Sequence, residues 1–319
     1  MDVIMIGTAV VTGAAGFIGS CLVDHLLRDG FSVIGLDNLR TGTKENLTEA
    51  LSHNNFRFEQ VDICSKDIAS VVRESVDVVF HLAAISSVKF SLENPVAVNK
   101  VNVTGTLNVL ELARKLDAKR FVFSSSAAVY GDPKHLPVKE DTPLRPLSPY
   151  AASKIAAEMY CLSYGSLYEM TPTIFRYFNA FGPRQEYSEY SGVIPIFISQ
   201  ALQNNEITVD GDGGQTRSFV HVDDVVRATY LASQQENHLA STFNLSGSES
   251  ISVLDLARMV KELVPESTSN IVFRDARDGD VRDSIGSMER TSKALGFSPT
   301  IPFKVGLNQT VSWYRSRTR

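Results

Sequence analysis

The sequence predicts an α/β fold, a doubly wound parallel sheet followed by a smaller mixed α/β region, on three observations. Short runs rich in Val, Ile and Phe alternate with amphipathic stretches through the first half of the chain. These runs mostly lack the polar alternation of a one-sided sheet, which indicates strands buried on both faces. After about residue 180 the pattern loosens into turn-rich, charged segments between helical stretches.

Composition limits the classes of function. The chain has 319 residues, 43% apolar and 21% charged, which is ample for a packed core. Its 31 Lys and Arg against 36 Asp and Glu give a formal net charge of −5, which argues against a nucleic-acid partner. Cys21, Cys64 and Cys161 lie far apart and predict neither disulfides nor a zinc site. We therefore expect a reducing, cytoplasmic location and no bound metal.

The elements of the first half follow in chain order. Ile18, Leu22 and Leu26 recur every four residues and predict a helix that stops near Gly30. The expected strands are Ala9–Thr12, Ser32–Leu36, Phe56–Gln60, Asp77–Leu82, Arg120–Ser124 and Thr173–Phe178. A longer helix is expected from about Pro95 to Leu116. Another begins at Ser148–Pro149, with Ser as N-cap and Pro in the first turn.

The N-terminal run has two possible interpretations. No charged residue occurs from Val3 to Val23, which is long enough to cross a bilayer. Glycines and hydroxyl residues interrupt the run, however, and Asp2 replaces the positive charge of a signal peptide, so no membrane association is expected. Thr12 to Gly19 has the sequence TGAAGFIG between a strand and a helix. This spacing is typical of a loop that lets the backbone approach a pyrophosphate at a helix N-terminus.

Acidic residues at strand ends support a dinucleotide site. Asp37 ends the second strand, 18 residues after Gly19. A carboxylate there accepts hydrogen bonds from a ribose diol and repels a 2′-phosphate, which favours NAD over NADP. The alternative is that Asp37 only begins a turn with Asn38. Asp62, after the third strand, is either an adenine contact or a turn former.

The second half is expected to bind the substrate. Helical stretches resume at Pro195–Gln203, Asp223–Ser233 and Val253–Leu263. We expect a Rossmann-type NAD-binding domain over residues 1–180, to which segments near 217–246 return, and a substrate-binding region over 181–319.

A tyrosine and a lysine carry the candidate chemistry. Tyr150 and Lys154 are one helical turn apart on one face. A nearby cation should lower the tyrosine pKa from about 10 and make Tyr150 a general acid/base for alcohol–ketone interconversion. The strand end Ser124–Ser126 should face the ligand crevice, where one hydroxyl can relay a proton. One or two of these serines are expected only to cap the strand.

With these motifs in this order, the chain resembles the extended short-chain dehydrogenases/reductases, specifically the NAD-dependent nucleotide-sugar epimerases. The resemblance covers essentially the whole chain. It implies Ser126, Tyr150 and Lys154 as catalytic residues and Asn102 as the support of the active-site helix. The residues implied to bind NAD are Gly13, Gly16, Phe17, Ile18, Asp37, Asn38, Asp62, Ile63, Leu82, Ala83, Ala84, Asn102, Ser124, Tyr150, Lys154 and Tyr177.

The implied reaction is 4-epimerisation of a UDP-hexose, UDP-glucose or UDP-galactose. Tyr150 would remove the proton of the 4-hydroxyl while C4 gives a hydride to NAD⁺. The 4-keto sugar would then turn over, and the hydride would return to its other face. Related 4,6-dehydratases carry acidic residues just after the catalytic hydroxyl, where this chain has Ala127 and Ala128. Alanine cannot transfer a proton, which favours epimerisation.

The resemblance also implies the substrate contacts. Arg176, Arg217 and Arg277 would make one cationic pocket for a diphosphate, although loop arginines are more often solvated. Val209 stands where the family often has an aromatic residue, and Ser218 replaces a common Asp, so uridine, thymidine and guanosine stay open. The residues implied to contact substrate are Ser126, Tyr150, Asn179, Val193, Val209, Arg217, Arg277, Asp280 and Ser284.

Ser284 bears on the range of substrates. In the family a bulky residue at the matching position excludes N-acetyl sugars, so Ser284 predicts activity on UDP-GlcNAc and UDP-GalNAc as well. The alternative is a loop serine with no substrate contact. Other functions left open are an epimerase of a UDP-uronate, a dehydrogenase that releases NADH, and a non-catalytic NAD-sensing regulator.

Two further expectations concern structure. His81 and His221 lie in apolar, strand-like contexts and are expected to be structural. The resemblance implies a homodimer formed through helices near residues 95–116 and 149–168. The small and flexible side chains expected to permit close helix approach there are Ala151, Ala152, Ala156, Ala157 and Met159.

Overall fold

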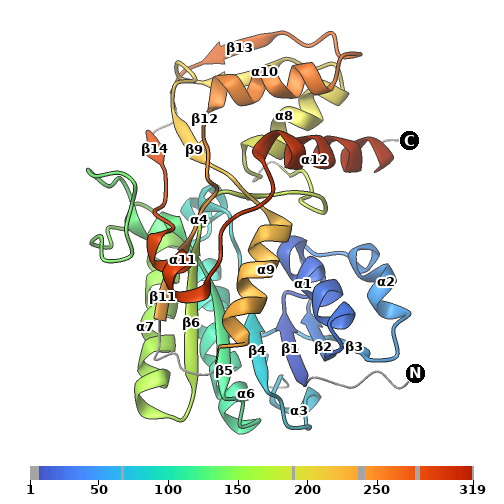
Figure 1. The fold of residues 1–319 in the computed structure, drawn as a ribbon, viewed down its shortest axis with the longest axis vertical. Coiled ribbons are helices and arrows are strands. Elements are labelled where there is room, and N and C mark those ends of the chain that lie inside the picture. Colours follow the sequence, from blue (N-terminus) through green and yellow to red (C-terminus); the bar gives the residue numbers. More distant parts are fainter. Residues whose placement is uncertain (1–6, 66–67, 189–190, 236–240, 277–280, 318–319) are drawn as a thin grey trace.

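The computed structural model describes residues 7–65, 68–188, 191–235, 241–276 and 281–317. A seven-stranded sheet forms its centre, and every pairing in that sheet is parallel (Figure 1). This confirms the predicted doubly wound α/β fold. In spatial order its strands are β11 (Ser241–Leu245), β6 (Thr171–Tyr177), β5 (Arg120–Ser126), β4 (Val78–His81), β1 (Thr8–Thr12), β2 (Ser32–Asp37) and β3 (Phe56–Gln60). The order reverses between β1 and β4, where ligands bind in such sheets.

Helices cover both faces of the sheet, which explains the apolar strands. Val10 and Val11 are neighbours on β1, both fully buried, and they pack into cores on opposite faces. The helices on the Val11 face are α1 (Phe17–Arg28), α2 (Thr48–Leu51), α9 (Val222–Ser233) and α11 (Glu289–Leu295). Those on the Val10 face are α3 (Ile68–Val71), α6 (Thr106–Lys115) and α7 (Pro149–Leu167).

The helix expected from about Pro95 to Leu116 is not a single α-helix. It consists of α5 (Pro95–Asn99), a π-helical turn over Lys100–Gly105, and α6, and it follows the short α4 (Val88–Glu93). A wide turn of this kind is often found at functional sites. In contrast, α7 begins as predicted, because the Ser148 hydroxyl accepts a hydrogen bond from Ala151 N at 3.1 Å.

Parts of the second half return to the large sheet, and the rest packs separately. β11 extends the sheet beside β6, and α9 packs on α1. A third apolar core lies among α8 (Val193–Leu202), α10 (Val253–Leu263) and α12 (Phe303–Arg317), which gather at one end of the molecule (Figure 1). The short strands there are β7 (Ala180–Phe181) with β10 (Val220–His221), β8 (Ile207–Asp210) with β13 (Ile271–Arg274), and β9 (Thr216–Ser218) between β12 (Ser250–Ser252) and β14 (Asp283–Ser284).

The uncharged N-terminal run belongs to the sheet from residue 7 onward. It forms β1, the glycine loop and the first turns of α1. Within the described ranges, no helix combines the length and apolar character that a membrane crossing needs.

Candidate active site

The glycine loop between β1 and α1 leaves no room for a side chain at Gly13 or Gly19. Gly13 has a φ of +71°, and a Cβ there would lie 2.8 Å from the backbone N of Ala83. A Cβ on Gly19 would collide with the carbonyl oxygen of Gly13. The loop therefore passes close under α1, which begins at Phe17 after the N-cap Gly16. This bare backbone at a helix N-terminus fits the pyrophosphate of a dinucleotide.

Asp37, at the end of β2, contacts the glycine loop through its carboxylate. Its carboxylate accepts hydrogen bonds from Ala15 N at 3.0 Å and from Leu39 N at 2.7 Å. Burial raises the pKa of Asp37, and these backbone hydrogen bonds act in the opposite direction. The turn-forming role considered for Asp37 is therefore present, and the same carboxylate lies beside the glycine loop, where a ribose ligand is expected.

The remaining cofactor candidates lie along the same sheet edge. Asn38 donates to the Asp62 carboxylate at 3.3 Å, which brings the two residues together. The backbone N of Leu82 donates to Thr12 O, and that of Ala83 to the Thr12 hydroxyl, both at 3.2 Å. Hydrogen bonds thus join the ends of β1 and β4, and the Asp37 carboxylate joins the end of β2 to the loop after β1.

His81 has the structural role predicted from its context. Its ring nitrogens lie 2.7 Å from the Thr12 hydroxyl oxygen and 2.9 Å from that of Thr106. Burial lowers the pKa of His81 to about 3, so the ring is neutral at physiological pH. His221 is buried as well, and its Nδ1 accepts from Asp223 N at 3.3 Å.

The structure brings Ser126, Tyr150 and Lys154 together at the carboxyl edge of the sheet. Tyr150 and Lys154 are 7% and 3% exposed, and the phenol of Tyr150 is hydrogen-bonded to Ser126. The Lys154 ammonium donates to the Ser124 carbonyl at 2.8 Å and lies 4.8 Å from the centre of the Phe123 ring. One face of α7 thus presents an acid/base and a cation to the end of β5.

The expected direction of the Tyr150 pKa is wrong for this structure. Burial raises the pKa of the phenol, and the hydrogen bond with Ser126 lowers it only in part. The charge of Lys154 is directed at the Ser124 carbonyl instead. Burial also lowers the pKa of Lys154 to about 8, against the opposing charge of Glu158. In this structure, therefore, Lys154 does not lower the pKa of the Tyr150 phenol.

The three serines at the end of β5 have different partners. Ser126 bonds Tyr150 and caps the following 3₁₀ turn, Ala127–Tyr130, by accepting from Ala128 N at 3.2 Å. The hydroxyl of Ser124 reaches Tyr177. Ser125 is buried and donates to Glu158 at 2.5 Å, away from Tyr150. The middle serine is thus structural.

Asn102 lies in the π-helical turn and contacts α7. Its side chain bonds both the N and the O of Ile85, at 2.8 and 3.0 Å, and donates to the Ser153 hydroxyl at 3.0 Å. Ser153 immediately precedes Lys154. The supporting role that the resemblance implies for Asn102 agrees with these contacts.

Two candidates lie in the core instead of at a ligand surface. Arg176 is 5% exposed and forms a buried ion pair with Glu158 at 2.7 Å, so it does not contribute to a cationic pocket for diphosphate. Val209 on β8 is fully buried in the third apolar core, so it exposes no surface to a nucleotide base. Tyr177 is also largely buried, and its hydroxyl lies 3.0 Å from that of Thr229.

The other substrate candidates lie on short elements. Arg217 on β9 and Ser284 on β14 are register partners, and the Arg217 guanidinium donates to Arg282 O at 3.1 Å. Asn179 has a φ of +42° and donates to Ser218 O at 3.0 Å. Val193 begins α8. The predicted clamp Arg277 and the ribose ligand Asp280 lie outside the described residues.

Sequence reasoning missed Glu158, which the structure places at the centre of the polar contacts behind the site. It is fully buried and bonds both Ser125 and Arg176. A signal was available, because Glu158 follows Lys154 by one helical turn on a helix rich in Ala. A charged side chain at that spacing must share the face of the catalytic residues.

Comparisons with known proteins identify the family. The signature of the NAD dependent epimerase/dehydratase family matches residues 9–246. UDP-glucose 4-epimerase of Mycolicibacterium smegmatis is 38% identical over 314 residues, 97% of this chain and 99% of that protein.

Two solved structures have nearly the same fold. UDP-N-acetylglucosamine 4-epimerase from Methanobrevibacter ruminantium, in complex with UDP-N-acetylmuramic acid, has a TM-score of 0.92 and 34% identity over 98% of this chain and 100% of its own. UDP-glucuronic acid 4-epimerase from Bacillus cereus, in complex with UDP-glucuronic acid and NAD, has a TM-score of 0.91 and 30% identity over 97% and 99%. This chain therefore belongs to the NAD dependent epimerase/dehydratase family and uses NAD.

Proposed function

We propose that the protein interconverts UDP-glucose and UDP-galactose, as a UDP-glucose 4-epimerase. One observation carries the proposal. Ser126, Tyr150 and Lys154 lie together at the carboxyl end of β5, in the same parallel sheet whose strand β1 leads into the glycine loop. The next two residues, Ala127 and Ala128, form a 3₁₀ turn that has no acidic side chain. We infer that the site exchanges the proton of one hydroxyl, whereas this turn supplies no further acid for the elimination of water.

The residues of this chain divide the chemistry among them. NAD, when bound, supplies the hydride acceptor and donor. Tyr150 exchanges a proton with the sugar 4-hydroxyl, and Ser126 hydrogen-bonds the reacting oxygen. Lys154 places a positive charge at the end of β5, on the side of the site where the cofactor would bind. The glycine loop would hold the pyrophosphate of the dinucleotide, and Asp37 a neighbouring ribose. The region after residue 180, with Asn179 and Arg217, binds the nucleotide half of the substrate.

The test follows the sugar directly. Purified protein is incubated with UDP-glucose without added NAD, and the mixture is observed by proton NMR. Appearance of UDP-galactose supports the proposal, together with NAD identified by absorbance and mass after denaturation. UDP-GlcNAc and UDP-glucuronate are tested in parallel. If only UDP-glucuronate is turned over, the proposed substrate changes from a UDP-hexose to a UDP-uronate. No turnover of any UDP-sugar would refute the activity.

We also propose that the N-acetylated pair, UDP-GlcNAc and UDP-GalNAc, is accepted. Ser284 is a partly exposed, small residue opposite Arg217 in the β9–β14 register. A small side chain beside a substrate arginine leaves room for an acetamido group. Comparison of kcat/KM for the four UDP-sugars checks this, and a preference above about 1000-fold for the non-acetylated pair would contradict it.

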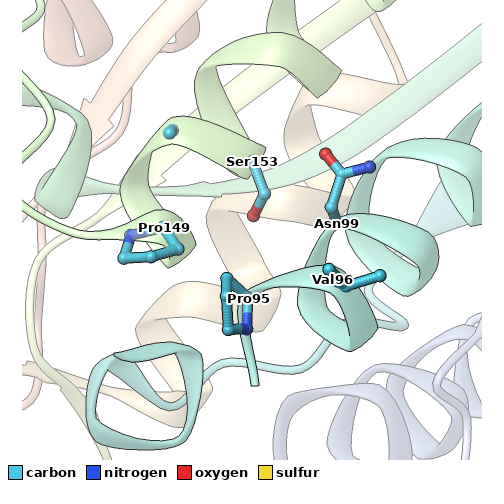
Figure 2. Close-up of a pocket in the computed structure, with 6 residues that line it drawn as sticks. Pro95, Val96, Asn99, Pro149 and Ser153 are labelled. Carbon is cyan, nitrogen blue, oxygen red and sulfur yellow. The ribbon is translucent and has the colours of Figure 1, made fainter. Parts of the chain in front are cut away.

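A homodimer is the third part of the proposal. A groove of about 390 Å³ runs between α5 and α7, and Figure 2 shows Pro149 and Ser153 of α7 facing Pro95, Val96 and Asn99. Val96 is 81% exposed and Leu167, at the end of α7, 69%. Exposed apolar side chains thus lie near both ends of α7, which fits an interface along this helix.

The residues that would permit close helix approach need correction. Ala151 and Ala157 are buried within the chain, at 1% and 0% exposure, and cannot meet a partner. Ala152 and Met159 are exposed. Sedimentation that shows a dimer, and a monomer for Val96→Glu, would support the interface, whereas a wild-type species of about 35 kDa would contradict it.

A further inference from the structure

A buried ion pair lies directly behind the active site. Arg176 of β6 and Glu158 of α7 are 5% and 0% exposed. Arg176 Nη2 donates to Glu158 Oε2 at 2.7 Å, and Nε lies 3.0 Å from Oε1. This arrangement is the two-bond geometry in which guanidinium and carboxylate groups fix each other's orientation.

The pair extends into a wider network. Arg176 Nη1 donates to the Tyr130 hydroxyl at 2.9 Å and to the Glu140 carbonyl at 3.0 Å. Tyr130 in turn donates to Asn244 Oδ1 at 2.6 Å, and Asn244 N donates to the Glu140 carboxylate at 2.9 Å. Arg176 therefore connects the turn after Ser126 to strands β6 and β11.

The same pair reaches the catalytic segment through Ser125, which donates to Glu158 Oε1 at 2.5 Å. On either side of Ser125, the Ser124 carbonyl accepts from Lys154 and Ser126 bonds Tyr150. Glu158 is on the same helix, one turn beyond Lys154. The carboxylate thus ties the strand end that carries the serine to the helix that carries the tyrosine and lysine.

Stability alone does not account for this pair. Removing two charges from water costs several kcal/mol per ion, and an apolar pair of similar volume often leaves the free energy of unfolding unchanged or higher. The core around it, which includes Phe123, Ala157 and Cys161, could hold apolar side chains. A fully bonded ion pair offers directional geometry, which apolar packing does not supply.

We propose that Glu158 and Arg176 are positioning residues for the reaction: through Ser125 and Tyr130 they fix the end of β5 against α7, so that Ser126, Tyr150 and Lys154 hold their productive arrangement. The role in the reaction rests on the 4-epimerase activity proposed above. The ordering of the end of β5 against α7 does not depend on that activity.

The carboxylate also acts on Lys154 through its charge. The groups around the ammonium are the Ser124 carbonyl, the Phe123 ring, Glu158, Cys161 and His81. Of these, Glu158 and Cys161 raise the pKa of Lys154, while burial lowers it to about 8. His81 is neutral, as shown above. Loss of Glu158 should therefore release the Lys154 proton at lower pH and move the alkaline limb of kcat/KM in the acid direction.

Three variants test the proposal. Glu158→Gln keeps the shape but leaves Arg176 unpaired. The double variant Glu158→Met with Arg176→Met removes both charges and avoids a buried unpaired ion, so it should fold. Glu158→Asp retains the charge and should recover part of the activity. We expect kcat to fall roughly 10- to 100-fold in the first two, with KM for UDP-glucose changed less than about threefold.

The matched control is a second arginine–carboxylate pair with a buried acid, here an aspartate. Asp224 on α9 is 1% exposed, pairs with Arg227 at 2.9 Å and accepts hydrogen bonds from Thr300 and Ile301. Asp224→Asn should lower the melting temperature but leave kcat and the pH profile unchanged. Wild-type kcat and pH profile in the folded double Met variant would overturn the proposal.

Hydrogen exchange separates this inference from the proposed activity. In the double Met variant, peptides that cover residues 122–131 should exchange faster than in wild type, whereas Asp224→Asn should affect residues 222–234 and 296–302. If the wild type turns over no UDP-sugar but the 122–131 segment loosens, the proposed function fails and the ordering role stands. If exchange over 122–131 does not change, the positioning role is refuted, whatever the activity.

Discussion

The two halves of the molecule build their sites differently. At the large sheet, Tyr150, Lys154 and Asn102 lie on helices of the sheet layers and are almost fully buried, with hydrogen bonds to neighbouring elements. Beyond residue 180, Arg217 and Ser284 lie on strands of two or three residues and are partly exposed. The proposed chemical step thus lies on buried, hydrogen-bonded helices, and the expected substrate contacts lie on short strands.

This difference has a physical consequence for specificity. Groups that transfer a proton must hold their geometry to within a fraction of an ångström, which packed strands and helices provide. Contacts that choose among sugars can change with a single side chain on a short strand. Related epimerases of nearly the same fold, named for UDP-glucose, UDP-N-acetylglucosamine and UDP-glucuronic acid, agree with this division.

The largest effect should come from Tyr150→Phe in the rigid half. Removal of the hydroxyl eliminates the proton exchange, and we expect kcat to fall about 10³-fold while NAD stays bound. The measurement is turnover by NMR together with the NAD content after denaturation. Tyr164→Phe, on the same helix, loses only a hydrogen bond to Glu111 and should retain activity. Substantial activity in Tyr150→Phe would show that another group is the base.

The second-largest effect should come from Gly13→Ala, which should weaken NAD binding. A Cβ would meet the Ala83 backbone in a φ of +71°, so the loop must move, and we expect NAD affinity to fall by roughly 100-fold. Gly296→Ala is the matched control, because Gly296 has a φ of +61° but no heavy atom within 4 Å of the added Cβ. Wild-type NAD affinity in Gly13→Ala would show that the close approach of Gly13 to Ala83 does not matter for cofactor binding.

Ser284→Tyr tests the adaptable half with a smaller effect. A bulky ring opposite Arg217 should reduce kcat/KM for UDP-GlcNAc by about tenfold or more and leave UDP-glucose within about threefold. Ser284→Ala, which keeps the space, should leave both rates unchanged. If the ratio of the two rates is the same in Ser284→Tyr, the side chain does not face the sugar.

The smallest expected effect is on stability. The folded pKa of Lys154, about 8, is below its ordinary value of 10.5, so the unfolded chain binds more protons between these values. The free energy of unfolding should therefore rise with pH from about 8 to 10.5. Lys154→Met should remove this slope and stabilise the protein near pH 7 by roughly 1–3 kcal/mol. Lys304→Met, at an exposed lysine, is the control for urea unfolding at several pH values. A slope that persists would contradict the buried-charge argument.

Local chemistry was sufficient to predict much of this protein. The apolar runs with glycine turns predict a doubly wound sheet, because strands buried on both faces need no polar alternation. The spacing of Tyr150 and Lys154 predicts their shared face, since helical geometry fixes which residues meet four positions apart. The Ser148–Pro149 start of α7 follows from the N-cap preference in the same way.

Only the tertiary structure decided the contacts between segments that lie far apart in the sequence. The sequence alone predicts that Arg176 binds phosphate. In the folded chain its guanidinium forms a buried ion pair with Glu158 instead. The helix from Pro95 widens into a π turn where Asn102 reaches Ser153, 51 positions away. The pKa of Tyr150 rises because its environment is buried, although the neighbouring lysine alone would predict the opposite. Sequence spacing determines which side chains share an element, whereas burial and charge pairing depend on which elements meet in the folded chain.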